Sequence, residues 1–405
     1  MSSSANELVE QRRRAARSSR RIIMNTDGGD TSQAPADEPK TPENFLKYRV
    51  SPLVGSQVDA ILDCTAGEFF SLDPEREEYD LPMGGGPVHG WARVLSDLGY
   101  DGLQLKIDFG HANDMEVFRS FRMNDTHDSK LTDSVPRWKK DHPDCLLGKQ
   151  GETPAYGGWR WSGLDYGTEP VQEKVFRVIE ETCRRYDVDG IDLDFYRHPH
   201  YFRPQMSGDP VTQKHCDVMT DFLKRVRQMT DEVALQRGRP LLVIARVFDS
   251  VGYSKAIGLD VERWMAEDLV DMLAGGGYDH LEPWEYLAEL GERHDIPVYA
   301  SISASRLKRS RFLDPESLED TGGWMTRAHP LFRPVWRGEA ANAWQAGVSG
   351  IYTFNLHDPG DDVFREIGSL ETLEGLAAVY DFNPGIHAGN WLKGGENFIR
   401  FPEAR

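Results

Sequence analysis

The stretch VQEKVFRVIEETCRRYDVDGIDLDF (Val171–Phe195) contains, in succession, the patterns of one helix and one strand. In Val171–Tyr186 the apolar residues recur every three or four positions, which is the spacing of an amphipathic helix. In Val188–Phe195 the apolar residues alternate with Gly and Asp, which is the spacing of a strand. A chain in which helices and strands alternate predicts a parallel sheet with helical crossovers.

The same unit recurs on both sides of this stretch. Seven further short apolar runs predict strands at residues 21–24, 59–65, 116–121, 241–248, 270–273, 297–302 and 350–355. Amphipathic stretches predict helices at residues 89–98, 101–111, 211–236, 261–269, 283–294 and 334–346. Eight strands that alternate with helices predict a single closed (β/α)8 TIM barrel. An open doubly wound sheet is the alternative, but neither GxGxxG after the first strand nor GxxxxGK[ST] is present.

The predicted barrel spans residues 20–380 and has a segment on either side. Residues 1–19 form a basic N-terminal arm, and residues 381–405 form a Gly- and Asn-rich tail that we expect to pack on the barrel. A long polar loop rich in Trp follows the third strand and ends near Thr168. We expect this loop to lie over the mouth of the barrel.

Composition and charge exclude several classes of protein. The 405 residues are 39% hydrophobic and 28% charged, as in globular proteins, and no apolar run reaches the roughly 18–20 residues that span a bilayer. The net charge of −19 disfavours binding to nucleic acid. The four cysteines form no CxxC pair and no secretory signal is visible, so we expect a reduced, cytoplasmic protein without a membrane partner. The sequence leaves the oligomeric state open.

In a (β/α)8 barrel the substrate meets the residues at the carboxyl ends of the strands. These ends are unusually polar here, and the loop after the third strand adds aromatic rings that can stack on sugars. The candidate substrate-binding residues are Asn25, Asp27, Glu68, Arg122, Asn124, Asp125, His127, Trp159, Trp161, Tyr196, Arg246, Asp279 and Asn355. Amide, carboxylate and guanidinium groups such as these can bind the hydroxyl groups of a sugar.

The fourth strand carries the strongest functional signal. Side chains alternate between the two faces of a strand, so Asp192 and Asp194 face the barrel interior while the apolar residues between them face the helices. Two buried carboxyl groups this close raise the pKa of one of them, which keeps one protonated beside an ionised neighbour. Two alternatives remain, namely an Asp–Arg network with Arg122 and Arg246 that only braces the barrel, and a metal site built from the DxD motif.

Five segments resemble a known family of barrel proteins. They are RRIIMNTDGGD (Arg20–Asp30), EVFRSFRMNDTHDS (Glu116–Ser129), LDYGTEPVQEKVFRVIEE (Leu164–Glu181), YDVDGIDLDFYRHPHYF (Tyr186–Phe202) and GVSGIYTFNLHDP (Gly347–Pro359). With these segments in this order, the chain resembles the TIM-barrel glycoside-hydrolase-like proteins of the family 10 glycosyl hydrolase-like group. The resemblance implies a (β/α)8 fold and the hydrolysis of carbohydrate.

The chain departs from other glycosidase patterns at two strands. Barrels of the common cellulase and xylanase type carry Asn-Glu after strand four and Glu on strand seven, where this chain has Asp194 and serines. The family 18 chitinase pattern DxxDxDxE is approached by residues 189–196, but Tyr196 stands at the glutamate position. The remaining Asp-based pair resembles that of the α-glycosidase barrels, whose nucleophile is a strand-four Asp.

We therefore predict a glycoside hydrolase that acts on a poly- or oligosaccharide through a pair of Asp carboxyl groups. Asp194 is the first candidate because it is nearest the strand end, and Asp192 would orient or tune it. Asp249, after the fifth strand, is the best candidate for the partner carboxyl group, and Glu68, Asp125 and Asp279 are the alternatives. This chemistry requires no cofactor or metal. A metal-dependent lyase or aldolase with Asp192 and Asp194 as ligands is one alternative, and a barrel that binds carbohydrate without catalysis is another.

Overall fold

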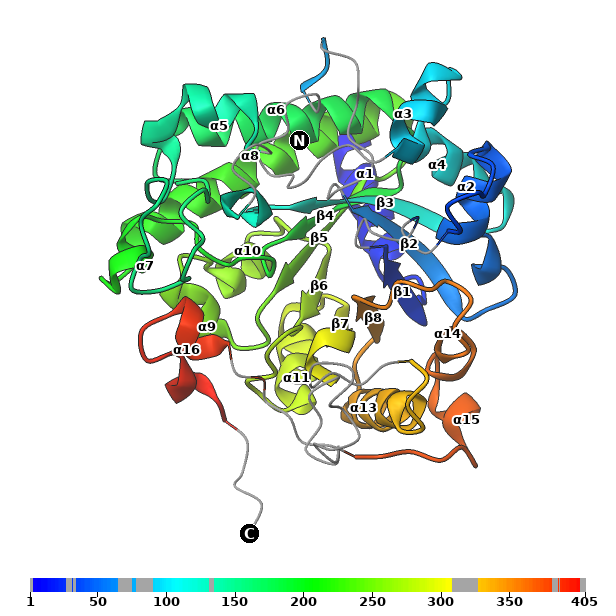
Figure 1. Ribbon diagram of the computed structural model, residues 1–405. Helices are drawn as coiled ribbons and strands as arrows, with labels where there is room; N and C mark the ends of the chain where they lie inside the picture. The colour runs from blue at the N-terminus through cyan, green and yellow to red at the C-terminus, as the bar shows by residue number, and fades with distance from the viewer. Residues whose placement is uncertain are drawn as a thin grey trace.

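The computed structural model describes residues 3–26, 31, 34–64, 75–77, 90–130, 135–307, 327–380, 385 and 387–400. In this part of the chain eight parallel strands form a closed barrel in the order β1 to β8, and β8 pairs with β1. Figure 1 shows the strands at the centre of the molecule with the helices around them. The (β/α)8 barrel that the sequence predicts is therefore confirmed, and the open sheet is excluded.

The strands begin and end within two residues of the predicted ones. They are β1 (Ile22–Asn25), β2 (Val58–Cys64), β3 (Glu116–Arg122), β4 (Gly190–Asp194), β5 (Leu242–Val247), β6 (Met272–Gly275), β7 (Val298–Ser303) and β8 (Gly350–Phe354). Short apolar runs suffice for these strands because every one of them is covered by neighbours on both edges of the closed barrel.

The helices that cover the barrel include all those predicted from periodicity, which are α3 (Gly90–Asp97), α4 (Gly102–Ala112), α6 (Glu169–Arg185), α8 (Gln213–Arg237), α10 (Val261–Ala266), α11 (Trp284–His294) and α13 (Phe332–Ala346). The others described are α1 (Ser3–Ala16), α2 (Pro42–Arg49), α5 (Arg137–Asp141), α7 (Pro204–Ser207), α9 (Val251–Ala256), α12 (Ala304–Leu307), α14 (Val363–Glu366), α15 (Leu370–Leu373) and α16 (Ala388–Trp391). Among the described helices, none combines the length and the apolar character that a membrane span requires.

Apolar residues pack against both faces of the strands, in one core outside the barrel and one inside it. The larger core lies between strands and helices and contains Ile191 and Leu193 of β4. The smaller core fills the barrel itself with Ala16, Ile23, Ala60, Leu62, Phe118, Leu242, Ile244, Met272, Ala274, Tyr299, Tyr352 and Phe354. Asp192 and Asp194, which alternate with the outward residues of β4, therefore point into the barrel.

The first residue of β4 lies in close contact with both neighbouring strands. A Cβ atom on Gly190 would collide with the backbone oxygen of Leu242 and with the ring of Phe118. Only glycine therefore fits at this position, where the strand packs against the apolar core on the amino-terminal side of the two carboxyl groups. This contact fixes the position of β4, and with it the position of Asp192 and Asp194 along the barrel axis.

The N-terminal segment begins with helix α1, which lies at the amino ends of the strands. Ala16, the last residue of α1, belongs to the core inside the barrel. The guanidinium of Arg12 is buried and forms ion pairs with Asp268 and, at 3.0 Å, with Asp271. A buried guanidinium is tolerated when it is paired in this way, so basic residues of this segment hold α1 against the barrel.

The segment after β3 and the C-terminal segment contact each other. Apart from α5 and the single 3-10 turn Pro143–Cys145, residues 137–168 contain only an isolated antiparallel bridge between Leu146 and Leu164. The backbone N–H of Gly157 donates to the carbonyl of Asn390 in α16 at 2.8 Å. These two segments therefore meet beside the carboxyl ends of β3 and β4.

Candidate functional site

Asp192 is held in a layer of neutral hydroxyl groups inside the barrel. Its Oδ2 accepts hydrogen bonds from Ser120 Oγ at 2.6 Å and from Tyr352 OH at 3.0 Å. The amide of Asn25 donates to Tyr352 OH at 2.8 Å and to Ser120 Oγ at 3.2 Å, so it orients both hydroxyl groups. Asp192 Oδ1 has no hydrogen-bond partner among the described residues.

Asp194 lies one layer nearer the mouth and has charged and polar partners. Arg246 Nη1 donates to Asp194 Oδ2 at 3.1 Å, and Arg246 Nε donates to Ser301 Oγ at 3.1 Å. The backbone N–H groups of Tyr196 and Arg197 donate to Asp194 Oδ1 at 2.9 and 3.2 Å. Asp194 is therefore an ion-paired carboxylate, which the turn after β4 and the neighbouring strand β5 both fix.

The two carboxyl groups of β4 differ in their electrostatic environment. Burial, and next the charge of Asp194, raise the pKa of Asp192 to about 7. The Ser120 hydroxyl and the Arg246 guanidinium oppose this shift without cancelling it. Near neutral pH the inner face of β4 therefore offers one carboxyl group that can hold a proton next to one that is ion-paired.

The guanidinium of Arg246 also contacts the aromatic rings of the barrel. Its Cζ atom lies 3.7 Å from the centroid of Phe354, 5.1 Å from that of Tyr196 and 5.3 Å from that of Tyr352. Arg246 Nη2 has no hydrogen-bond partner among the described residues. Because the guanidinium of Arg246 lies beside Asp194, it would repel a divalent cation bound between Asp192 and Asp194. The geometry therefore does not favour the metal-dependent alternative.

The residues after β3 form a second group. Asp125 accepts from Arg122 Nη1 at 2.7 Å and from His127 Nδ1 at 2.6 Å. Burial favours the neutral form of Asp125, but His127, Arg122 and His198 together hold its pKa well below its usual range. Asn124, in contrast, binds backbone alone, with contacts to Leu164 and to the His200 carbonyl. Its amide therefore fixes the loop after β3.

Asp125, His127 and His198 place ligand atoms within 4.8 Å of one another, which is close enough for a metal ion. Their present partners disfavour a cation. His198 Nδ1 accepts from the backbone N–H of Thr126 at 3.0 Å, and Arg197 Nη2 lies 2.9 Å from His127 Nε2. The chemistry of this group therefore fits an ion-paired carboxylate better than a metal centre.

The two remaining acidic candidates lie after β5 and β6. Both oxygens of Asp249 accept from the backbone N–H of Leu281, at 3.1 and 2.9 Å, and burial raises its pKa. Asp279 accepts from the backbone N–H of His387 at 2.8 Å, and burial raises its pKa to about 7. Asp279 Oδ2 lies 3.5 Å from Tyr196 OH, so Tyr196 connects Asp279 with the turn that holds Asp194.

The aromatic candidates and Asn355 differ in their exposure. Trp161 is 7% exposed, and its Nε1 donates to the Ser129 carbonyl at 3.3 Å, so it belongs to the core under the loop. Trp159 is half-buried. Asn355 adopts a φ of 57° and donates to Ser305 Oγ at 2.6 Å, and its Oδ1 has no hydrogen-bond partner among the described residues. Asp27 and Glu68 lie outside the described residues.

Three side chains that the sequence did not predict contact the candidate site residues. Ser120 and Tyr352 both bind Asp192, and Arg197 connects the turn after β4 with His127. The alternation of side chains between the two faces of a strand predicts that two of them point into the barrel. Ser120 lies two residues before Arg122 on β3, and Tyr352 lies on the inward face of β8.

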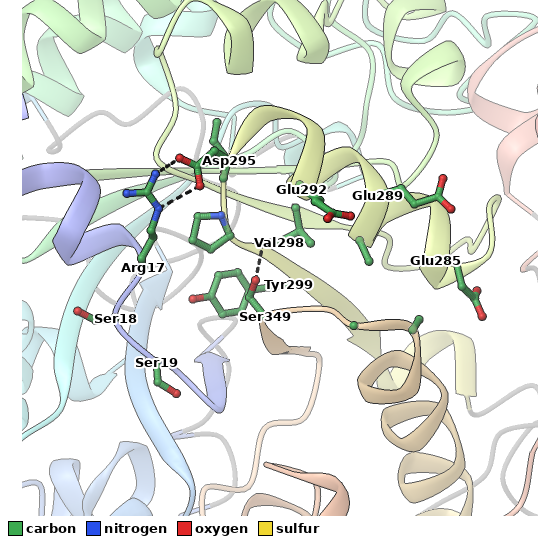
Figure 2. Close-up of a pocket in the computed structure, with 16 residues that line it drawn as sticks. Arg17, Ser18, Ser19, Glu285, Glu289, Glu292, Asp295, Val298, Tyr299 and Ser349 are labelled. Atoms are coloured by element: carbon green, nitrogen blue, oxygen red, sulfur yellow. Dashed lines mark hydrogen bonds and ion pairs between the residues drawn. The ribbon is translucent and has the colours of Figure 1, made fainter. Parts of the chain in front are cut away.

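A large cavity lies at the other end of the barrel. It has a volume of about 630 Å³ and is lined by residues of α11, by the amino ends of β7 and β8, and by the residues after α1. Figure 2 shows Arg17 paired with Asp295 there, with Glu285, Glu289 and Glu292 nearby. Barrel enzymes act at the carboxyl ends of the strands, so this cavity does not replace the site around Asp194.

Comparisons with known proteins find a related family and several similar folds. Residues 91–216 match the family model described as glycosyl hydrolase-like 10. The glycosyl hydrolase YngK of Bacillus subtilis (strain 168) is 29% identical over 129 residues, which cover 29% of this chain and 23% of that protein. The match therefore spans less than a quarter of that relative.

Solved structures with a similar fold are more distant in sequence. Alpha-L-fucosidase isoenzyme 2 from Paenibacillus thiaminolyticus is 16% identical, with a TM-score of 0.49 over 88% of this chain and 49% of that chain. The PgaB (BpsB) glycoside hydrolase domain from Bordetella bronchiseptica is 12% identical, with a TM-score of 0.46 over 87% of this chain and 99% of that chain.

The match to the family model includes the centre of the candidate site. Residues 91–216 contain β3, β4 and the loop between them, and therefore Asp192, Asp194 and the group around Asp125. The resemblance that the sequence indicates is thus confirmed for this segment, and the chain is a TIM barrel whose residues 91–216 are similar to the glycosyl hydrolase-like 10 family.

Proposed function

We propose that the protein is a glycoside hydrolase that cleaves a poly- or oligosaccharide at the carboxyl end of the barrel. The observation that carries this proposal is the unequal environment of the two carboxyl groups on β4. Asp194 is ion-paired with Arg246, whereas burial and the charge of Asp194 raise the pKa of Asp192 to about 7. Glycosidic cleavage requires two carboxyl groups with unequal roles, one of them a proton donor. The ion pair with Arg246 suits Asp194 to the role that needs a carboxylate, and the proton donor is assigned to another strand below.

Asp194 is the carboxylate that we assign to the substrate, as nucleophile or as base. It lies at the last position of β4, and its partners orient it from β5 and from the turn that follows. Asp192 lies one layer deeper and acts as a positioning residue, because it sets the charge on this face of the strand. The guanidinium of Arg246 offsets the free-energy cost of burying the carboxylate of Asp194.

The proton donor to the leaving group is better assigned to Asp279 than to Asp249. Both carboxyl groups are buried, and both have a raised pKa. Both oxygens of Asp249 accept from a backbone N–H, while Asp279 Oδ2 faces Tyr196 OH at 3.5 Å. Tyr196 therefore supports a role for Asp279 in the same site as Asp194, with a pKa suited to general acid catalysis near neutral pH.

Hydrolysis of a panel of oligosaccharides by the parent protein and by Asp194→Asn tests the proposal. The variant keeps the shape of the side chain but removes its charge, so kcat should fall by about 10²–10⁴-fold. Asp192 can ionise in its place beside Arg246, so the variant should remain folded, which its melting temperature checks.

Asp221→Asn is the matched control. Asp221 is exposed on α8, where it lies 3.7 Å from Lys224 Nζ, and this variant should keep full turnover. Full activity of Asp194→Asn on a substrate that the parent protein cleaves would show that the site is assigned wrongly. Binding of an oligosaccharide by the parent without any cleavage would favour a carbohydrate-binding barrel instead.

A further inference from the structure

A group of cations surrounds the aromatic rings beside Asp194. Lys130 Nζ lies 4.2 Å from the ring centroid of Trp159, and the Cζ atom of Arg160 lies 4.5 Å from the same centroid. Arg160 is also 4.3 Å from the ring centroid of Trp391, so its guanidinium lies between two indoles. Arg197, the residue whose N–H binds Asp194, completes the group. We call Lys130, Arg160 and Arg197 with these two Trp residues the cationic cluster.

The cationic cluster is continuous with the carboxylate that we assign to the reaction. The guanidinium of Arg197 lies 2.9 Å from His127, whose ring is 4.8 Å from that of His198. The ring of His198 is in turn 6.1 Å from that of Trp159, which carries Lys130 and Arg160. A substrate that reaches Asp194 from this side therefore passes over cations and aromatic rings.

Two members of the cationic cluster lack a compensating carboxylate. Among the described residues, no carboxylate oxygen lies within 4.0 Å of Lys130 or of Arg160. Arg160 Nη1 donates to the backbone carbonyl of Gly157, and its Nε has no hydrogen-bond partner in the described part of the chain. Burial, and next the charge of Arg197, lower the pKa of Arg160 to about 10. Asp125 is the carboxylate of the described residues whose charge opposes this shift, and it already pairs with Arg122.

An arginine elsewhere in the chain that also lies over an aromatic ring has a carboxylate partner. Arg225 is a close comparison, because its guanidinium lies 3.6 Å from the ring centroid of Phe176 and also 2.7 Å from Glu173. With a net charge of −19, the chain has ample carboxylates to pair with its cations. Cations that gather in a binding site without a carboxylate partner are unfavourable there. A bound anion offsets that cost by pairing with them.

We infer that the substrate of this site is an anionic saccharide, in which a carboxylate or sulfate group binds the cationic cluster while a sugar ring stacks on the half-buried Trp159. This inference rests on the proposed function, because it names the substrate class of the same site. Arginine binds both groups through paired N–H donors, and the flat guanidinium stays stacked on the indoles as it does so.

Calorimetric titration of the parent protein with three sets of oligosaccharides of equal length tests the inference. The sets are neutral glucans, oligouronates and sulfated galactans, so the second and third distinguish a carboxylate from a sulfate ligand. At least one anionic set should bind about tenfold more tightly than the neutral set, and the advantage should shrink between about 50 mM and about 500 mM NaCl. Equal affinity for the neutral and both anionic sets would overturn the inference.

Variants identify the residues responsible. Arg160→Met keeps the length and the stacking of the side chain but removes its charge, and it should reduce the preference for the anionic set at least about tenfold. Lys130→Met changes an exposed residue and gives the same test without risk to the fold. Arg225→Met, on α8, should retain the full preference. An unchanged preference in both Lys130→Met and Arg160→Met would contradict the inference.

Cleavage measured on the same three sets separates this inference from the proposed function. Tight binding of an anionic set without cleavage supports the cationic cluster and contradicts the hydrolase. Cleavage of the neutral set alone, with no gain in affinity for the anionic sets, supports the hydrolase and contradicts the role of the cationic cluster.

Discussion

Asp194 and Arg246 stand directly opposite each other in the register of β4 and β5, and Arg246 Nη1 lies 3.1 Å from Asp194 Oδ2. Both residues are 0% exposed, so the pair forms inside the barrel and not at its rim. A charge buried at this depth must be compensated by a partner of opposite sign. The closed barrel supplies that partner because adjacent inward positions of neighbouring strands lie side by side.

Replacement of Arg246 by Met should destabilise the fold. The variant leaves Asp194 buried beside Asp192 without its counter-charge, and breaking one side of a buried pair lowers the free energy of unfolding by about 3–5 kcal/mol. Urea denaturation measures the change. Arg225→Met, which breaks an exposed pair on α8, should change the free energy of unfolding by less than about 1 kcal/mol. Equal losses in both variants would contradict a special role for the buried pair.

Asp192 should make the fold less stable as the pH rises. Its pKa is about 7 in the folded protein and about 3.9 in an unfolded chain, so the folded state holds a proton that the unfolded state has released. The free energy of unfolding therefore falls through this range, by at most about 1.4 kcal/mol per pH unit, and levels off above pH about 7.

Asp192→Asn removes this dependence and should gain stability relative to the parent between pH about 4 and about 7. The readout is the difference in the free energy of unfolding between variant and parent at several pH values. The control Asp221→Asn should give a difference that does not change with pH. A constant difference for Asp192→Asn as well would show that Asp192 ionises normally in the folded state.

Tyr352→Phe should shift the pH dependence of activity upward. The hydroxyl of Tyr352 donates to Asp192 Oδ2 at 3.0 Å and stabilises the ionised carboxyl group. Without this donor the pKa of Asp192 rises, so the alkaline limb of the kcat/KM profile moves to higher pH. Tyr299→Phe, inside the other end of the barrel, should leave the profile in place. A downward shift in Tyr352→Phe would show that the hydroxyl stabilises the protonated form of Asp192.

The fold and the inward carboxyl groups follow from local patterns in the sequence. Period-two alternation in residues 188–195 and period-three-to-four spacing in residues 171–186 depend only on neighbours in the chain, and both describe the structure correctly. The positions of Asp192 and Asp194 on one face follow from the same alternation, since a strand has no other way to present them.

The roles of loop residues depend on partners that are distant in the sequence. Asn124 was predicted to bind substrate, but its amide bonds to the backbone of Leu164 and His200, which no local pattern reveals. Asp249 was preferred as partner carboxyl group, but the backbone N–H of Leu281 binds it. Such contacts depend on the tertiary packing of the loops over the barrel. The sequence therefore predicts that the mouth of the barrel is polar, but it does not predict the function of each polar residue.

Trp159 and Trp161 should respond to substitution in opposite ways, although the sequence predicts that both bind substrate. Trp159 is half-buried and belongs to the cationic cluster, so Trp159→Ala should raise KM by several-fold, as expected for the loss of about 1 kcal/mol of stacking, with little change in melting temperature. Trp161 is 7% exposed and bonded to Ser129, so Trp161→Ala should lower the free energy of unfolding by about 3–5 kcal/mol and leave KM nearly unchanged. Steady-state kinetics and urea denaturation on both variants give the four values. A higher KM with unchanged stability in Trp161→Ala would place that ring in the binding surface instead of the core.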